Sequence, residues 1–218
     1  MQFVDIHTHE KKGTADIEIL NVFAQNLHRE IELPVCTAGF HPWHLNNYDE
    51  REMINLLHDL ADRYEILAIG ECGIDLTISA EPEKQERLFL KQAGIAENKK
   101  KPLIVHCVKA YPEMIRLQKL INANMPWILH GYSAKPQVTK SLLSYNFYFS
   151  FGETLLNEKR KAVDSLKIIP TDRLFFETDE SHVPVKEIYF FAAKILRMDA
   201  EALKNQVYEN YKRVFGNR

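Results

Sequence analysis

The feature that most constrains the fold of this chain is the alternation of short apolar runs with longer amphipathic segments. Several of these segments begin on a proline, which is favoured in the first turn of a helix, and their apolar residues recur on one helical face. Strands that alternate with helices in this way favour βα units and a parallel sheet. The runs that we predict to be strands are residues 3–7, 16–20, 34–39, 65–70, 103–107, 126–130, 146–151 and 173–177.

The number of strands then selects among parallel α/β folds. Eight strands favour a TIM-like (β/α)8 barrel over a doubly wound sheet, which would need a glycine-rich first turn where this chain has His7-Thr8-His9-Glu10. Residues 8–33 are too few for two full βα units, so we expect a barrel that is abbreviated near the N-terminus, and one domain over residues 1–218. The predicted helices are 49–63, 82–100, 112–122, 136–145, 157–168, 185–197 and 200–215.

Composition excludes several classes of protein. A formal net charge of −2 provides no global basic surface for nucleic acid, so any polyanion would have to be held locally. The chain has three widely spaced cysteines, Cys36, Cys72 and Cys107, which is an odd number. We see no leader peptide and no apolar run long enough to span a membrane. We therefore expect a soluble cytoplasmic protein without disulfides. Nothing indicates an obligatory protein partner. We expect Cys72 and Cys107 to be small buried side chains.

The first strand ends in a possible pair of metal ligands. Residues i and i+2 of a strand lie on one face, so His7 and His9 point the same way. Neutral imidazole is the commonest protein ligand for transition metals. Alone, this pattern is weak.

Other predicted strands also end in ligand-type residues. Glu71 and Asp75 follow run 65–70, and the remaining such residues are His106, His130, Glu177 and Asp179. In a barrel the carboxyl ends of the strands converge, and clustered carboxylates and histidines are favourable when cations bind between them. The set exceeds what one tetrahedral zinc takes and suits two divalent ions.

Motifs at these strand ends follow one another in a fixed order. They are Val4-Asp5-Ile6-His7-Thr8-His9, Gly39-Phe40-His41-Pro42, Gly70-Glu71-Cys72-Gly73-Ile74-Asp75, Val105-His106-Cys107, His130-Gly131-Tyr132-Ser133, Glu177-Thr178-Asp179 and Asn210-Tyr211-Lys212-Arg213-Val214-Phe215. In this order they resemble the motifs of the TatD-type metal-dependent deoxyribonucleases of the amidohydrolase superfamily. The resemblance implies a TIM-like barrel with a divalent-metal phosphodiesterase site.

The resemblance also implies a ligand set. His7, His9 and Asp179 would hold one ion, Glu71 would bridge to a second, and the second site would be completed by His106 and His130. The two divalent ions would be Mg²⁺, Mn²⁺ or Zn²⁺, and the substrate DNA or another phosphodiester. The chain departs from the family where substrate is contacted, at Leu76-Thr77, at Lys109 and at Glu180-Ser181-His182-Val183-Pro184.

Our mechanistic hypothesis is hydrolysis by a water activated between two metals, with Asp179 and Glu71 as the catalytic carboxylates. Asp179 would orient that water and accept its proton. For Glu177 and Asp5 we leave two roles open, direct participation and hydrogen-bonded support of the ligands. His41 and His44 would contact substrate or support the ligands.

Two other functions remain open from the sequence. One keeps the barrel and the metals and changes the substrate to a small ester, lactone or amide; Glu71, where many such relatives use a carboxylated lysine, favours the nuclease. The other is a metal-binding protein without turnover, against which the intact ligand set argues.

Overall fold

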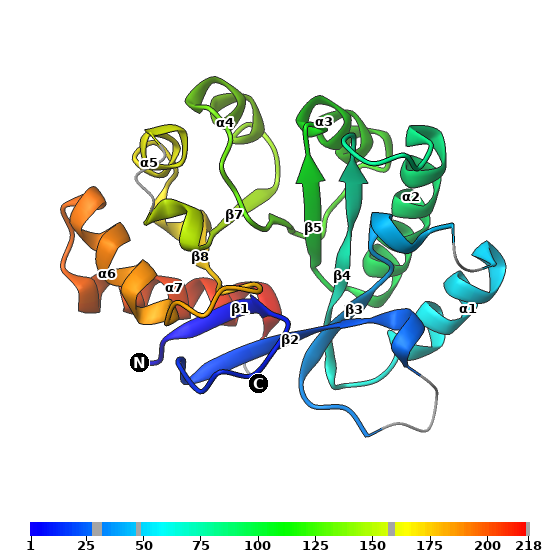
Figure 1. Ribbon diagram of the computed structural model, residues 1–218, viewed down its shortest axis with the longest axis horizontal. Coiled ribbons are helices and arrows are strands. Elements are labelled where there is room, and N and C mark those ends of the chain that lie inside the picture. The colour runs from blue at the N-terminus through cyan, green and yellow to red at the C-terminus, as the bar shows by residue number, and fades with distance from the viewer. Residues whose placement is uncertain (28–31, 47–48, 157–159, 217–218) are drawn as a thin grey trace. The chain divides into compact units, whose positions relative to one another are not determined.

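The computed structural model describes residues 1–27, 32–46, 49–156 and 160–216 (Figure 1). Its eight strands follow one another in chain order. All eight correspond to predicted strands, because each is an apolar run; most of these runs are buried, whereas β2 is largely half-buried. They are β1 Val4–Thr8, β2 Ile17–Phe23, β3 Cys36–Gly39, β4 Ile66–Asp75, β5 Leu103–Val108, β6 Trp127–Leu129, β7 Phe147–Phe151 and β8 Leu174–Phe176.

The helices also match the predictions to within a few residues at each end. Among the described residues, the first α-helix follows β3, which confirms the abbreviated start of the barrel. The described helices include none with the length and apolar character of a membrane span. Residues 157–159 of the predicted helix 157–168 lie outside the described residues. The α-helices are α1 Glu50–Leu60, α2 Pro82–Lys99, α3 Tyr111–Leu120, α4 Pro136–Leu142, α5 Arg160–Leu166, α6 Val185–Leu196 and α7 Ala200–Phe215; the 3₁₀ turns are η1 Ala24–Asn26, η2 Pro42–His44, η3 Glu153–Leu155 and η4 Thr171–Arg173.

The chain forms two compact units, which we describe separately. The central unit is Asn21–Ile128, and the terminal unit is Met1–Leu20 with Leu129–Arg218. The expectation of a single domain over residues 1–218 stays a prediction.

The central unit is built on three parallel strands, β3, β4 and β5. Figure 1 shows β4 and β5 side by side, with α2 packed along β4. Phe89 of α2 meets Trp127 edge to face, with ring centroids 4.9 Å apart, and both side chains are buried. This aromatic contact fills the interface between α2 and the sheet.

Strand β4 is longer than predicted, because it continues past Gly70 to Asp75. Gly73 is what permits the extension. A Cβ atom at this position would lie 1.8 Å from the carbonyl oxygen of His106, its partner on β5. The predicted strand ends at residue 70, whereas in the structure Gly73 allows a close approach of two strands beyond that point.

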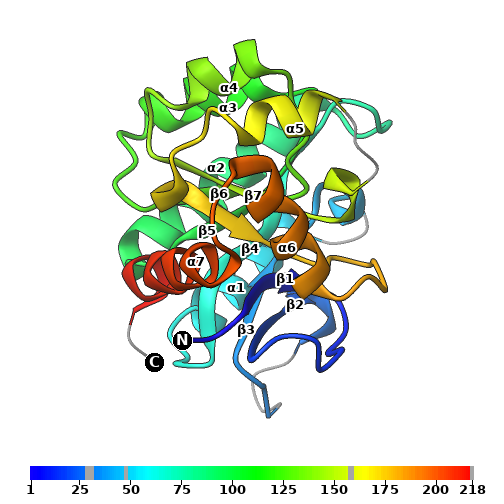
Figure 2. The ribbon, with the colours of Figure 1, turned by 90° about the vertical axis from the view of Figure 1, so that its left-hand side faces the viewer.

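In the terminal unit, β1 is held on both edges. It pairs in parallel with the first residues of β2, and Thr8 bridges to Asp179 just after β8. Helices α6 and α7 pack against each other and against β8 (Figure 2). The buried Tyr189 hydroxyl of α6 donates to the carbonyl of Val4 at 2.8 Å, which fixes the start of β1.

The C-terminal motif has a structural role in this unit. Asn210 of α7 is fully buried, and its side-chain amide donates to the carbonyls of Thr171 and Leu174 at 2.8 and 2.9 Å. Arg213 donates to the carbonyl of Asp172 and to the side chain of Asn210. The motif thereby fixes η4 and the beginning of β8, the strand that leads to Glu177 and Asp179.

Replacement of Gly73 by alanine tests the close approach of β4 and β5. We expect Gly73→Ala to lower the free energy of unfolding by at least about 1–3 kcal/mol, because the methyl group would overpack against the main chain of His106. Gly94→Ala in α2 is the matched control: its Cβ would meet nothing within 4 Å, so we expect a gain of about 0.5–1 kcal/mol. Urea titration measures both values, and a Gly73→Ala protein as stable as wild type would contradict the packing argument.

Candidate metal centre

The terminal unit brings together the two histidines of β1 and the aspartate after β8. The Nε2 atoms of His7 and His9 lie 3.7 and 3.3 Å from the same oxygen of Asp179, Oδ1. Each of the three residues offers one ligand atom within 4.8 Å of the others. His7 is fully buried, whereas the Asp179 side chain is 40 % exposed. The group is therefore fixed by the protein on the His7 side and open to solvent on the Asp179 side.

A second group in this unit shares Asp179 and adds His130 and Glu177. The His130 ring lies 4.5 Å from the His7 ring, centroid to centroid. Oε1 of Glu177 accepts a hydrogen bond from the main-chain nitrogen of Gly131 at 2.5 Å and lies 3.5 Å from Nδ1 of His130. A carboxylate beside one ring nitrogen orients the other for a metal, which fits a supporting role for Glu177.

Two buried carboxylates make this region favourable for a cation. Among the described residues, Oε2 of Glu177 is buried and has no hydrogen-bond partner. Burial also raises the pKa of Asp5 to about 7, although Thr178 donates to it from both its hydroxyl and its main-chain nitrogen. Carboxylate and imidazole donors at these distances are the chemistry that divalent transition metals prefer, so the residues present fit a metal.

Lys12 holds the main chain of the loop that carries Asp179. Its Nζ atom donates to the carbonyls of Asp179 and Ser181 at 2.8 and 2.6 Å and to the hydroxyl of Thr178 at 3.2 Å. Asp179 has a φ of 52°, in the left-handed region that non-glycine residues rarely adopt. Lys12 therefore stabilises a strained backbone position.

Glu18 braces the loop from which Lys12 extends. Its carboxylate accepts hydrogen bonds from four consecutive main-chain nitrogens, those of residues 12–15. Burial acts to raise the pKa of Glu18, but these four bonds outweigh it and place the pKa below its usual value. No pattern in the sequence singled out Lys12, in a short polar connection, or Glu18, the second residue of β2.

The central unit contains a second cluster around Glu71. Its Oε1 atom lies 3.1 Å from Nε2 of His41 and 2.9 Å from Nδ1 of His106. Asn21 fixes the glutamate from another side: its side-chain oxygen accepts from the main-chain nitrogen of Glu71 at 2.9 Å and from the Thr37 hydroxyl at 3.0 Å. Asn21 interrupts the apolar stretch of β2, and that interruption was the signal available in the sequence.

His41 supports Glu71 in this geometry. Its Nδ1 atom accepts a hydrogen bond from the main-chain nitrogen of Trp43 at 3.2 Å, so in neutral His41 the ring hydrogen lies on Nε2, which faces Glu71. This arrangement favours a role for His41 as the hydrogen-bond donor that orients Glu71, and disfavours a role for His41 as a metal ligand.

His106 lies between two carboxylates. Its Nδ1 faces Glu71, and its Nε2 lies 3.4 Å from Oδ2 of Asp75. A neutral imidazole has one N–H, so either tautomer leaves a nitrogen lone pair facing a carboxylate oxygen. A bound cation removes this repulsion, and the cluster therefore fits a metal as well.

Asp75 is held as a charged partner for His106. Thr77 donates to it through both its hydroxyl and its main-chain nitrogen, and Nε1 of Trp43 donates at 2.9 Å. Burial acts to raise the pKa of Asp75, but the bonds from Thr77, Trp43 and His106 outweigh it, and the pKa lies below its usual value. Thr77 thus stabilises the carboxylate.

The other candidates from the sequence lie outside these clusters. Lys109 and His182, from the segments where the chain departs from the family motifs, are exposed loop residues. His44 lies near the ring of Phe23 but belongs to none of the metal-type groups found among the described residues. Cys72 is fully buried and burial raises its pKa, so it is a small apolar side chain.

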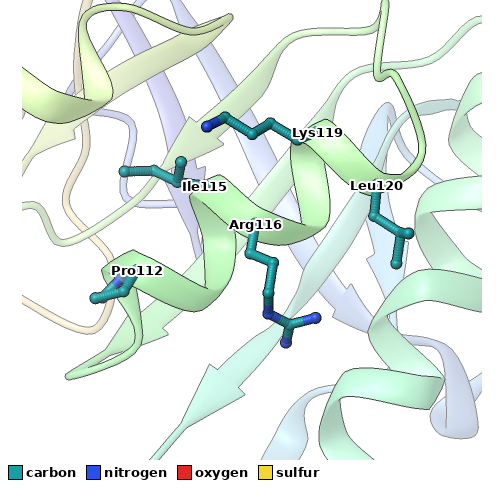
Figure 3. A pocket seen from close by; sticks show the side chains of 5 residues that line it. All are labelled: Pro112, Ile115, Arg116, Lys119 and Leu120. Carbon is teal, nitrogen blue, oxygen red and sulfur yellow. The ribbon is translucent and has the colours of Figure 1, made fainter.

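The pocket drawn in Figure 3 has different chemistry. It lies on α3 in the central unit and is lined by Pro112, Ile115, Arg116, Lys119 and Leu120. These side chains provide no carboxylate or imidazole, and the Arg116 guanidinium is ion-paired with Glu86. This pocket offers no metal ligands.

The fold and the ligand-type clusters define a metal-dependent hydrolase built on an α/β barrel. The chain belongs to the TatD related DNase family, whose sequence model matches residues 14–216. It is similar to the 3′-5′ ssDNA/RNA exonuclease TatD of Dickeya dadantii, with 28% identity over 200 residues that cover 82% of this chain and 75% of the relative. For the exonuclease of the same name from Escherichia coli, identity is 28% over 169 residues, which cover 76% of this chain and 65% of the relative.

Two solved structures share the fold. The TatD homologue YjjV from Escherichia coli has a TM-score of 0.88 and 19% identity, with coverage of 99% of this chain and 98% of that one. A TatD family hydrolase from Entamoeba histolytica has a TM-score of 0.81 and 18% identity, with coverage of 100% and 99%. These likenesses confirm the predicted TIM-like barrel.

Substitution of Lys12 tests its hold on Asp179. We expect Lys12→Met to weaken Mn²⁺ binding about 10–100-fold, because residues that orient metal ligands typically contribute that much to affinity. Lys11→Met removes the same charge at the exposed neighbouring position and should leave binding unchanged. Isothermal titration measures both, and equal affinities for the two variants would show that Lys12 does not position the site.

Proposed function

We propose that this protein is a metal-dependent nuclease that hydrolyses phosphodiester bonds of single-stranded nucleic acid. The observation that carries the proposal is the pair of clusters, each with a central carboxylate close to two histidines: Asp179 in the terminal unit and Glu71 in the central unit. Membership of the TatD related DNase family supports it, as do relatives named ssDNA/RNA exonucleases.

We assign the proposed ligands as follows. One divalent ion, Mg²⁺, Mn²⁺ or Zn²⁺, would be held by His7, His9 and Asp179. A second would be held by Glu71, His106 and His130, with Glu71 as the bridging carboxylate. Bound divalent ions supply positive charge that promotes deprotonation of water and neutralises the phosphodiester.

The chain's own residues supply orientation and proton transfer in this proposal. Asp179 accepts a proton from the attacking water, and its partly exposed carboxylate suits that role. Lys12 fixes the backbone of Asp179. His41 and Asn21 hold Glu71, and Asp75 fixes the ring of His106.

The proposed attraction for nucleic acid is local. A net charge of −2 gives the whole chain no affinity for a polyanion, so the metals would provide the phosphate contacts. A small ester, lactone or amide substrate, and metal binding without turnover, are the alternative outcomes of the assay.

A substrate panel tests the function. Metal-loaded protein should release nucleotides from single-stranded DNA or RNA with Mg²⁺ or Mn²⁺, and should act weakly on carboxylic esters and lactones. Preferred hydrolysis of an ester or lactone would select the first alternative. Bound metal with no hydrolysis of any substrate would reject the enzyme.

Asp179→Asn tests the proton acceptor. Asparagine tolerates the left-handed backbone of residue 179, so the fold should be kept while the acceptor is lost. At saturating metal, which His7 and His9 would still hold, we expect nuclease turnover to fall roughly 10²–10⁴-fold, the usual contribution of general-base catalysis. Near-wild-type turnover would remove Asp179 from this role.

Metal removal tests the ligand assignment without an activity assay. At 100 times its dissociation constant, a metal that binds only folded protein adds about 2.7 kcal/mol to the free energy of unfolding, so chelation should lower the melting temperature. His9→Ala should reduce this metal-dependent shift. His58→Ala, at an exposed position on α1, should leave it unchanged. Equal shifts in both variants would contradict the assignment of His9.

A further inference from the structure

An exposed but firmly held tryptophan lies beside the central cluster. Trp43 is 59% exposed, although indole is among the side chains that gain most from burial. The other tryptophan of the chain, Trp127, is fully buried in the same unit. Scattered exposed apolar residues are normal, so exposure alone would mean little.

What distinguishes Trp43 is its fixed orientation. Its Nε1 donates to Oδ2 of Asp75 at 2.9 Å, and its main-chain nitrogen donates to Nδ1 of His41. Its ring meets the His41 ring at 84°, with centroids 4.8 Å apart, and the His106 ring at 76° and 6.0 Å. The indole therefore stands rigidly next to a proposed ligand with much of its surface in solvent.

The surroundings extend the aromatic character of this place. The His41 ring also packs edge-on against Phe23 at 5.9 Å, and Phe23 packs against His44 at 5.2 Å. The result is an aromatic group carried by the end of β2 and by η2, with Trp43 as its exposed member.

We propose that Trp43 is a stacking platform for a nucleobase of the substrate strand. This inference rests on the proposed function and adds a subsite to it. A planar ring already fixed by the protein binds a base with little loss of side-chain entropy, and stacking tolerates any sequence because every base has an aromatic face. Trp43 would hold the base of a nucleotide whose phosphate reaches the Glu71–His106 cluster.

Fluorescence tests the contact independently of catalysis. A phosphorothioate-linked oligonucleotide that resists cleavage is titrated into metal-loaded protein, and binding is followed by anisotropy of a dye on the 5′ end. We expect binding to quench tryptophan emission from Trp43. The Trp43→Phe variant, which reports Trp127 alone, should bind with no quench. Binding to wild type without any quench would overturn the proposal.

Abasic substrates test its effect on turnover. Removing one base at a time from the last four nucleotides should, at one position, lower kcat/KM of wild type about 5–150-fold, the range for loss of one stacked base. In Trp43→Ala, the ratio of kcat/KM between the intact and the abasic substrate should fall to nearly one. Trp43→Phe should keep most of it, since it retains a ring while losing the bond to Asp75.

Tyr64→Ala is the matched control. Tyr64 is another exposed aromatic of the central unit, but it precedes β4, at the opposite end of that strand from Asp75, so its loss should leave the base dependence unchanged. Unchanged base dependence in Trp43→Ala would overturn the stacking role and leave the nuclease proposal standing. Absence of cleavage by wild type would reject the nuclease proposal, and the quenching experiment would then decide the fate of the aromatic subsite.

Discussion

Burying a carboxylate at the end of a strand costs free energy unless hydrogen-bond donors or cations lie next to it. Many of the polar contacts in this structure offset that cost. Asp5 accepts hydrogen bonds from Thr178 and from the main-chain nitrogen of His7, and the Glu71 carboxylate lies next to the side-chain amide of Asn21 and two imidazoles. Most of these donors come from segments distant in sequence. The positions of β1, β2 and β8 are therefore tied to the same polar groups that can hold metal.

Hydrophobic pattern was sufficient to predict the elements of the fold. The strands are apolar and mostly buried, and the helices carry amphipathic faces, so β1 to β8 and α1 to α7 were found within a few residues of their ends. The extension of β4 was missed because a glycine permits a turn and a close approach equally well. Only the position of Gly73 opposite His106 distinguishes the two.

The ligand-type residues were predictable because each follows an apolar strand, whereas the residues that hold them were not. Lys12 donates to a carbonyl 167 residues away, and Asn21 braces a glutamate 50 residues away. Such contacts depend on the folded arrangement and leave no periodic signal in the sequence. Trp43 directly follows the Gly39-Phe40-His41-Pro42 motif and was not singled out from the sequence; its exposure and its bond to Asp75 are seen only in the structure.

The connection between β1 and β2 has a consequence for how this chain can vary. Surface loops generally tolerate insertions, since little depends on their length. Here one glutamate collects four successive backbone amides, and the lysine at the start of that turn reaches across to the segment after β8. An added residue would change the direction of the Lys12 side chain and break its contact with the segment after β8. The length of this short loop is therefore constrained by residues far away in the sequence.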